Sequence, residues 1–377
     1  MEILEIDEAT AFDVFAEQDW TDGLPIIPPT PDRVVAMLAG AGAEEDEVLG
    51  SVPARNRTVT AGMAAVNAVM AGCLPDHFPV VLAALRAMLD PAWNANGVLT
   101  STGGSAACII VSGPLASKIG MNAKSNLFGP GNRANATIGR AVRLVAMNVI
   151  GARTSVQDES CMATPAKYTF CFAEDDPPEP WQPLRQRLGF DIGDTTVTVM
   201  ASEGPRQMAN FTNGQPEGVL RSMLSLITPP GSVIVGKGGQ GIVVLGPEHQ
   251  FIIREQGWTQ RDVQVFLARE SRVTQEEIES AGVLLERPGD HHYLPVGEDG
   301  KYPTFHGPDD ILVVTAGGHG AGWSSYIPSF VPSKHSVIIT RRVREAGEVL
   351  PDCGPDSCEI DITKILAQST SAGRENV

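Results

Sequence analysis

The chain is poor in aromatic residues and in cysteine, and it contains no long apolar run. Aromatic residues make up 6% of the 377 residues, so the core must consist mainly of Val, Ile, Leu, Ala and Met. The six cysteines include no Cys-x-x-Cys pair, which argues against a disulfide framework. No apolar run reaches the roughly 18 residues of a membrane-spanning helix, and the acidic start lacks the basic segment of a signal peptide. We therefore expect a cytoplasmic protein with reduced thiols and no membrane partner.

Basic residues are scarce too. The 28 Lys and Arg residues stand against 45 Asp and Glu residues, which gives a net charge of −17. A uniformly acidic chain repels phosphate backbones, and no long basic run offsets that repulsion. The charge therefore argues against a nucleic-acid partner.

Glycine and proline are abundant and recur in a pattern. The 39 glycines and 28 prolines exceed their usual combined share of ~12%. Much of the excess falls in an order that occurs twice: a helix, a proline stop, a strand, Gly-Gly, a second strand, Gly-Pro and another helix. The strands of the first copy are expected at residues 97–100 and 108–111, and those of the second at 232–235 and 242–244. The pattern predicts an internal duplication.

Short β-branched runs that alternate with amphipathic helices are typical of α/β proteins. We therefore predict an α/β fold with an N-terminal arm and two related, duplicated lobes, in which mixed sheets are flanked by helices. The expected divisions are an N-terminal arm and helix (1–50), a first α/β lobe (51–176), a linker (177–193), a second α/β lobe (194–345) and a C-terminal tail (346–377).

Two Gly-Pro corners, at Gly113 and Gly246, each follow a strand and open a helix. Free backbone N–H groups at such a corner suit a carboxylate or phosphate oxygen, and a plain turn is the alternative. A glycine-rich loop, residues 317–322, contains His319 and is followed by Ser324. We predict that Gly113, Gly246 and Ser324 bind substrate and that His319 transfers protons.

Metal binding has little local support. The sequence contains no His-Glu-x-x-His or His-x-His pattern. A ligand set would have to be assembled from His249, His319 and a carboxylate across the two lobes. The cofactor is therefore unknown, and a metal ion is one alternative. The absence of a Gly-x-Ser-x-Gly sequence argues against a serine hydrolase of that type.

Cys73 is the strongest candidate for a nucleophile. It follows the helix end at Gly72 and precedes the next helix, whose dipole favours a thiolate. His77 is a candidate base four residues further on. The alternative is a small buried cysteine between two helices. The other cysteines are expected in strands (Cys108 and Cys171), in a loop (Cys161) and in the tail (Cys353 and Cys358).

The segment from residue 129 to residue 140 is the most unusual in the chain. Asn132 is suited to cap a helix, and Arg133 and Asn135 fall in its first turn. An arginine at a helix start opposes the dipole unless it faces an anionic ligand, where guanidinium and helix N–H groups cooperate. We predict that Asn132, Arg133 and Asn135 bind substrate; a salt-bridged surface helix is the alternative.

Lys167 and Glu174 flank a predicted strand that contains Cys171. A lysine, a thiol and a carboxylate around one strand can line a site for proton transfer. We therefore count Lys167 and Glu174 as candidate catalytic residues. A core thiol with flanking surface charges is the alternative.

Several segments together resemble a known family. They are residues 20–31, 67–73, 129–140, 165–168, 171–174, 246–249 and 257–258. Over roughly residues 20–340 the chain is similar to a large, mostly uncharacterised bacterial family associated with small UGSC-motif thiol or selenol proteins. The resemblance implies an enzyme or enzyme subunit with a redox-active partner chain, and the family pattern includes Cys73, Asn132, Arg133, Asn135, Lys167 and Glu174. This sequence has no UGSC tetrapeptide, so selenol chemistry would belong to the partner.

The sequence thus predicts an enzyme that acts on a small anionic metabolite, bearing a carboxylate or carbonyl group, in a cleft between the lobes. Thiol-dependent chemistry and acid/base chemistry both fit, so lyase, hydratase and redox reactions stay open. The alternatives are a metal-dependent lyase and a non-catalytic small-molecule-binding subunit of a redox complex. We also expect a homo-oligomer.

Overall fold

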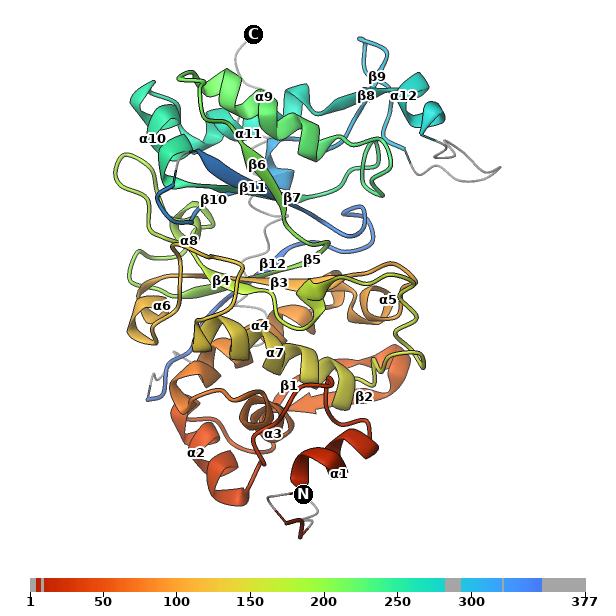
Figure 1. Cartoon of the computed structure of the whole chain (residues 1–377), viewed down its shortest axis with the longest axis vertical. Helices are drawn as coiled ribbons and strands as arrows, with labels where there is room; N and C mark the ends of the chain where they lie inside the picture. The colour runs from red at the N-terminus through yellow and green to blue at the C-terminus, as the bar shows by residue number, and fades with distance from the viewer. Residues whose placement is uncertain (1–4, 8–9, 282–292, 321, 348–377) are drawn as a thin grey trace, which may run out of the picture.

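Four layers make up the protein, in a computed structural model that describes residues 5–7, 10–281, 293–320 and 322–347 (Figure 1). Helices form the two outer layers, and two four-stranded sheets face each other between them. The predicted α/β fold, with mixed sheets flanked by helices, is confirmed.

The two sheets have the same pattern of strand directions. The first has the order β12-β5-β3-β4 and consists of β3 (Ala106–Ser112), β4 (Cys171–Ala173), β5 (Thr196–Ser202) and β12 (Ile339–Arg342). The second has the order β6-β11-β7-β10 and consists of β6 (Arg206–Ala209), β7 (Gly241–Leu245), β10 (Ile311–Thr315) and β11 (Trp323–Pro328). In each sheet one pair is parallel (β3 with β4, β7 with β10), and the other neighbours are antiparallel.

The outermost strands are exchanged between the two halves of the chain. β6 follows β5 in the sequence but pairs with β11 in the second sheet. β12 follows β11 but pairs with β5 in the first sheet. With the two halves divided between β6 and β7, each sheet therefore takes one edge strand from the other half of the chain.

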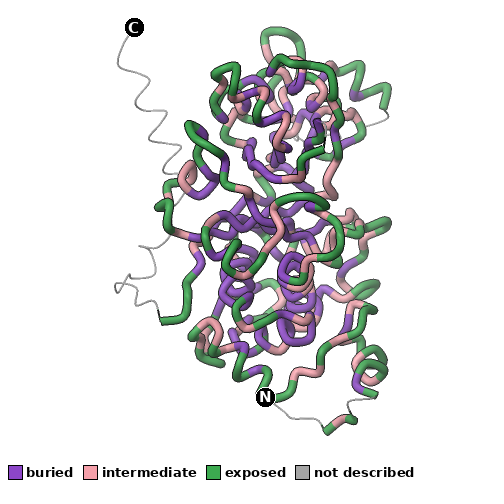
Figure 2. The backbone as a smooth tube through the Cα atoms, turned by 60° about the vertical axis from the view of Figure 1, so that its left-hand side comes forward, coloured by how far each residue is buried: buried purple, intermediate pink, exposed green. Residues whose placement is uncertain are grey.

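Both faces of the central strands are buried. Ile110 of β3 and Val244 of β7 lie in the core between the two sheets. Their neighbours Ile109 and Val243 pack against the outer helices. Strands buried on both faces read as continuous apolar runs, as these do. Figure 2 shows the buried backbone concentrated in the middle of the molecule.

Among the described residues, seven helices have nine or more residues. Against the first sheet lie α4 (Phe78–Met88) and α7 (Arg133–Asn148), and α2 (Pro31–Ala41) and α3 (Ala61–Ala71) pack on the outer side of these two helices. Against the second sheet lie α9 (Pro216–Ile227), α10 (Pro247–Glu255) and α11 (Gln260–Glu270). The shorter elements are α1 (Ala11–Glu17), α5 (Ala95–Leu99), α6 (Pro114–Lys118), α8 (Leu184–Arg187), α12 (Gln275–Ser280), β1 (Val48–Val52) with β2 (Arg57–Thr60), and β8 (Arg272–Thr274) with β9 (Lys301–Pro303). In the described part of the chain, none of the helices has the length and apolar character needed to cross a bilayer.

The N-terminal arm is clamped onto α3 and α7. Asp22 forms two hydrogen bonds with Arg140 of α7, from Nε at 2.9 Å and from Nη2 at 2.8 Å. The Ile27 backbone N–H donates to the carbonyl of Met70 at 3.1 Å. These contacts fix the arm across the helices of the first sheet.

Two predicted strands are wrong. Residues 97–100 belong mostly to helix α5, because Asn94 caps that helix through the Gly97 N–H at 3.2 Å. Residues 232–235 form turns, and the left-handed φ angles of Gly236 and Gly238, 74° and 76°, keep the chain turning. Short apolar runs that are buried but not extended explain both errors.

The strand pairing crosses the expected divisions of the chain. β5 and β12 fall in the predicted second lobe, residues 194–345, but lie in the first sheet. The predicted linker contains helix α8 and a buried Trp181, whose Nε1 donates to Trp258 O at 2.9 Å. Most of the predicted tail, including Cys353 and Cys358, lies outside the described residues.

Candidate functional site

Three predicted residues, Gly246, His249 and Ser324, meet at the second Gly-Pro corner. The Gly246 N–H donates to Ser324 Oγ at 3.1 Å, and Ser324 Oγ lies 2.7 Å from His249 Nδ1. His249 Nε2 lies 3.0 Å from Asn210 O, so it carries the proton, and the serine hydroxyl donates to Nδ1. Burial lowers the pKa of His249, which keeps the ring neutral. Because both ring nitrogens and the hydroxyl are engaged, this group joins β11 to α10 rather than presenting a ligand atom.

The first corner is closed in a similar way. The Leu115 N–H at the start of α6 donates to Thr195 Oγ1 at 3.0 Å. A Cβ on Gly113 would lie 2.4 Å from Asp194 O, and Gly113 has a φ of 136°. Glycine is required here by backbone packing and conformation. The geometry therefore supports the plain-turn alternative for Gly113.

His319 lies on the surface beside Glu248. Its side chain is 90% exposed, and its Nδ1 is 3.7 Å from Glu248 Oε1. Partial burial raises the pKa of Glu248, but the Gly320 N–H at 2.9 Å contributes to a net lowering. Among the residues that the structure describes, no group of three or more His, Cys, Asp or Glu side chains is placed to hold a metal ion. The ligand set suggested for His249 and His319 is not assembled in this part of the chain.

Asn132 and Asn135 hold the start of α7. Asn132 accepts the Asn135 N–H at 2.9 Å, as predicted for a cap, and donates to Gly120 O at 2.8 Å. The buried Asn135 amide pairs with both backbone groups of Asn122, at 2.9 Å each. Both side chains thus organise the preceding loop.

Cys73 is buried between α3 and α7, and its expected low pKa is wrong. Burial raises the pKa of Cys73 to about 12, against the opposing effect of a hydrogen bond to Thr137 O and the charge of Arg133. Arg133 is exposed and donates through Nε to Gly72 O at 2.9 Å. Burial also lowers the pKa of His77. The neutral thiol fits the alternative of a packed cysteine.

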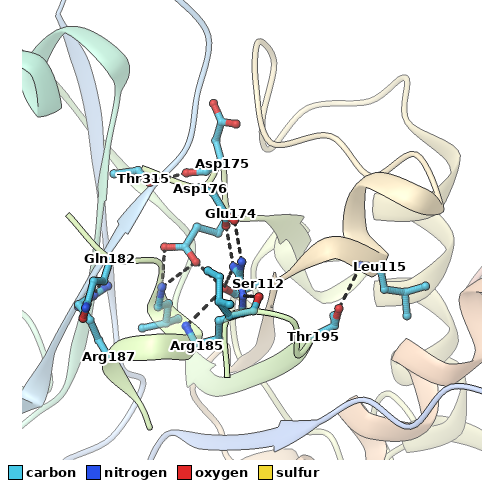
Figure 3. Close-up of polar contacts among 12 residues, drawn as sticks. Ser112, Leu115, Glu174, Asp175, Asp176, Gln182, Arg185, Arg187, Thr195 and Thr315 are labelled. Atoms are coloured by element: carbon cyan, nitrogen blue, oxygen red, sulfur yellow. Dashed lines mark hydrogen bonds and ion pairs between the residues drawn. The ribbon is translucent and has the colours of Figure 1, made fainter. Parts of the chain in front are cut away.

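Glu174 is fully enclosed at the end of β4 (Figure 3). It accepts a 2.5 Å hydrogen bond from Ser112 Oγ and bonds of 2.8 and 3.0 Å from the Leu184 N–H. Burial raises the pKa of Glu174 to about 7, although the charge of Arg187 and these hydrogen bonds oppose the rise. Because Leu184 is the first residue of α8, Glu174 fixes the start of that helix.

Further polar contacts around Glu174 join the two sheets (Figure 3). Arg187 of α8 donates to the carbonyl of Val313 in β10. Thr315, at the end of β10, donates to Asp175 O at 2.5 Å. At this edge the space between the sheets is bridged by hydrogen bonds, so Glu174 is positioned as a structural acid rather than in an open cleft.

Lys167 lies at the centre of a different charged group, which we call the Lys167 centre: Lys167, Asp158, Ser160 and Arg143. Lys167 Nζ is 2.7 Å from both carboxylate oxygens of Asp158 and 2.7 Å from Ser160 Oγ. Arg143 of α7 donates to Asp158 Oδ2 at 2.8 Å. The group therefore combines a helix, a long loop and the turn before β4.

The Lys167 centre carries one more positive than negative charge. Burial lowers the pKa of Lys167, and Asp158 partly offsets that effect. For Asp158 burial acts in the opposite direction, but hydrogen bonds from Lys167 and Ser160 leave its pKa below the ordinary value. The carboxylate is thus ionised at neutral pH and is shared by two cations. Such an excess attracts an anionic group.

A small cavity adjoins these charges. Its volume is about 20 Å³, and Lys167, Arg143 and Ser105 are among the residues that line it. This volume is enough for about one water molecule. The hydroxyl of Ser105 is buried and has no hydrogen-bond partner in the structure. The remaining lining residues are apolar or glycine, so the polar groups of Ser105, Arg143 and Lys167 form one part of an otherwise apolar wall.

The backbone around the Lys167 centre is unusual. Ala163 and Ser155 have φ angles of 55° and 61°, a region that residues other than glycine seldom adopt. A Cβ on Gly104 would lie 2.6 Å from Ala163 Cα, so the predicted Gly-Gly pair packs against this loop. Strained backbone is frequent at functional sites. Together, charge, cavity and strain make the Lys167 centre the best candidate site.

Sequence reasoning found Lys167 but missed its partners. Asp158 and Ser160 lie in a long loop between α7 and β4, and long loops in compact domains are often functional. Arg143 interrupts an apolar run of α7, which indicates a cation with a buried partner. These two signals, read together, would have pointed to the group.

No protein-family model matches the chain, and no curated protein matches it.

Proposed function

We propose that the chain is an enzyme that acts on a small anionic metabolite with a carboxylate or carbonyl group, by lyase- or hydratase-type acid/base chemistry at the Lys167 centre. The observation that supports this best is that Lys167 and Arg143 share the single carboxylate of Asp158 beside a cavity for about one water molecule. An excess positive charge in a chain of net charge −17 suits an anionic substrate group.

Each member of the centre has a distinct role in this proposal. Arg143 donates one hydrogen bond to Asp158, and its remaining N–H groups bind the substrate carboxylate. Lys167 stabilises the negative charge that develops when a proton leaves the carbon next to a carbonyl. Ser160, which accepts from Lys167 and donates to Asp158, takes this proton as its own hydroxyl proton passes to the Asp158 carboxylate.

Acid/base chemistry fits the structure better than a thiol mechanism does. Burial raises the pKa of Cys73 and of Cys171 above the ordinary thiol value. Both thiols are therefore protonated at neutral pH, whereas the thiolate is the nucleophile. A small thiol or selenol partner protein, a cytoplasmic location and a homo-oligomer stay predictions of the sequence.

A non-catalytic binding subunit is the second candidate. The ammonium of Lys167 has three acceptor atoms around it, as many as its N–H donors. A fully engaged lysine fits a structural ion pair that holds an anion without transferring a proton. The two candidates differ in whether a bound ligand is changed.

We also propose that the two halves of the chain arose by duplication. The support is that both sheets have the same order of parallel and antiparallel neighbours. A Gly-Pro corner follows the equivalent strand, β3 or β7, in each half.

Proton exchange tests the enzyme proposal without knowledge of the full reaction. The protein is incubated in D₂O with a panel of small hydroxy- and oxo-carboxylates, and loss of the C–H signal next to the carbonyl is followed by proton NMR. We expect Ser160→Ala to slow exchange by about 100-fold or more, because it removes the relay but leaves the ion pair of Lys167 with Asp158. Lys118→Met is the matched control, since Lys118 is exposed and forms an ion pair with Glu345 at the surface.

The outcomes separate the two candidates. Unchanged exchange in Ser160→Ala and in Lys167→Met would overturn the catalytic role of the centre. A ligand of the panel that raises the melting temperature of the wild type, without exchange, would favour the binding subunit.

A further inference from the structure

An open groove lies beside the loop that carries Asp158, and its lining residues are positively charged or neutral. Its volume is about 350 Å³, which lies within the ~300–1,000 Å³ of small-molecule sites. The β1–β2 turn, helix α5 and the segment after α7 form its walls. The residues that matter for the argument are Arg55, Arg57, Asn96, Gly151 and Gln157.

Two arginines line the groove, and no acidic side chain is among its lining residues. In a chain of net charge −17, two cations without a carboxylate form an isolated positive surface. Among the described residues, the side chain of Arg57 has no ion-pair partner, and it is exposed. The groove therefore offers charge that the fold itself does not neutralise.

Arg55 is held in a fixed orientation. Its Nε donates to Asn96 Oδ1 at 3.0 Å. A Cβ on Gly151 would lie 4.0 Å from Arg55 Nη1, so the guanidinium reaches across the backbone at that glycine. With Nε engaged, the two terminal nitrogens stay free to bind two oxygens of one anion. Pre-orientation lowers the entropy cost of binding.

Gln157 is an uncharged polar residue in the wall of the groove. Its side-chain oxygen is buried and has no hydrogen-bond partner in the structure. A buried acceptor without a donor is unfavourable; because Oε1 is enclosed while the residue as a whole is only partly buried, the side chain has to turn toward the groove before a ligand hydroxyl can satisfy it. The groove residues thus supply two guanidinium groups for an anion and one amide oxygen that can accept a hydrogen bond from a hydroxyl group.

We propose that this groove binds a small phosphate ester that carries a hydroxyl group. A phosphate monoester carries a charge of about −2 near neutral pH, which two arginines match. The side chain of Gln157, which is only partly buried as a whole, turns toward the groove so that its oxygen accepts from this hydroxyl. The proposal does not rest on the function of the Lys167 centre, because none of the groove residues belongs to that centre.

Calorimetric titration of the full chain with glycerol phosphate, inorganic phosphate, glycerol and malate tests the proposal. We expect glycerol phosphate to bind more tightly than inorganic phosphate, and glycerol not to bind. Arg57→Gln is expected to weaken binding by about tenfold or more without loss of folding, because the side chain has no partner to lose. Arg269→Gln makes the same charge change on α11, where Arg269 pairs with Glu270, and is expected to leave binding unchanged.

Gln157→Leu separates the hydroxyl from the phosphate. We expect it to reduce the affinity for glycerol phosphate to that for inorganic phosphate, with phosphate binding unchanged. The proposal would be overturned by absence of binding at about 10 mM ligand, by equal weakening in Arg57→Gln and Arg269→Gln, or by malate binding as tightly as glycerol phosphate. Melting temperatures of all variants confirm that folding is retained.

Discussion

Replacing Glu174 with glutamine should remove a fall in stability with rising pH. Burial raises the pKa of Glu174 from 4.5 to about 7 in the folded protein. Between these two pH values the folded state keeps a proton that the unfolded state has released. Folding is therefore opposed increasingly as the pH rises through this window, and the full penalty is present above about pH 7.

The size of the effect follows from the same two values. A rise in pKa from 4.5 to about 7 corresponds to a penalty of about 3 kcal/mol in the free energy of unfolding at pH 8. A glutamine side chain is neutral at every pH and can still accept the Leu184 N–H. The Glu174→Gln variant should thus match the wild type near pH 5 and exceed its stability by up to about 3 kcal/mol at pH 8.

Urea unfolding at pH 5, 6, 7 and 8 measures this difference. Glu277→Gln is the control, because hydrogen bonds from Thr274 lower the pKa of the exposed Glu277, so its titration lies in more acidic solution. Its difference from the wild type should stay constant over this range. If the curves of Glu174→Gln and wild type ran parallel from pH 5 to pH 8, the raised pKa of Glu174 would be refuted.

Three other predictions concern the thiols, the corner and the arm. At neutral pH iodoacetamide should label the exposed Cys161 and spare the buried Cys73, as peptide mapping by mass spectrometry will show; rapid labelling of Cys73 would contradict its burial. Gly246→Ala places a Cβ 2.1 Å from a backbone oxygen, so urea unfolding should show a loss of about 1–3 kcal/mol or more. Asp22→Asn removes the negative charge that faces the guanidinium of Arg140, and a loss of about 3 kcal/mol with faster proteolysis of the arm is expected.

Two controls sharpen these measurements. Gly231→Ala adds a Cβ where no atom lies within 4 Å, so its stability should stay near that of the wild type. Lys118→Gln removes an exposed ion pair with Glu345, which should cost under about 1 kcal/mol. If Gly231→Ala lost as much stability as Gly246→Ala, packing around Gly246 would not be the cause of that loss. If Lys118→Gln lost as much as Asp22→Asn, burial of the ion pair between Asp22 and Arg140 would not be the cause.

The fold was predictable where local chemistry and tertiary packing agree. β3 and β7 are short apolar runs with Ile and Val at their centres, and each is followed by Gly-Pro, so nothing competes with a strand there. Residues 97–100 have a comparable apolar character, but the cap at Asn94 decides for a helix. The exchange of β6 and β12 leaves no local mark, because an edge strand looks the same in either sheet.

The candidate site was only half predictable for a related reason. Lys167 stands out beside its strand, but its partner Asp158 becomes visible only when α7 and the loop are packed together. Cys73 shows the reverse error. Its position before a helix favours a thiolate locally, whereas its pKa is set by burial against Thr137, sixty-four residues away. At a fully buried thiol, the cost of taking the thiolate out of water outweighs the contribution of a helix dipole.

The exchanged edge strands also have consequences for synthesis of the chain and for its expression as separate fragments. β12 ends at Arg342, so the first sheet lacks this edge strand until the chain has been synthesised as far as residue 342 of 377. Until then the edge of β5 is open to pairing with another chain. Separate expression of either half would leave one sheet incomplete and one strand without a neighbour. The protein should therefore be expressed with both halves together, since no cut between the described strands leaves two complete sheets.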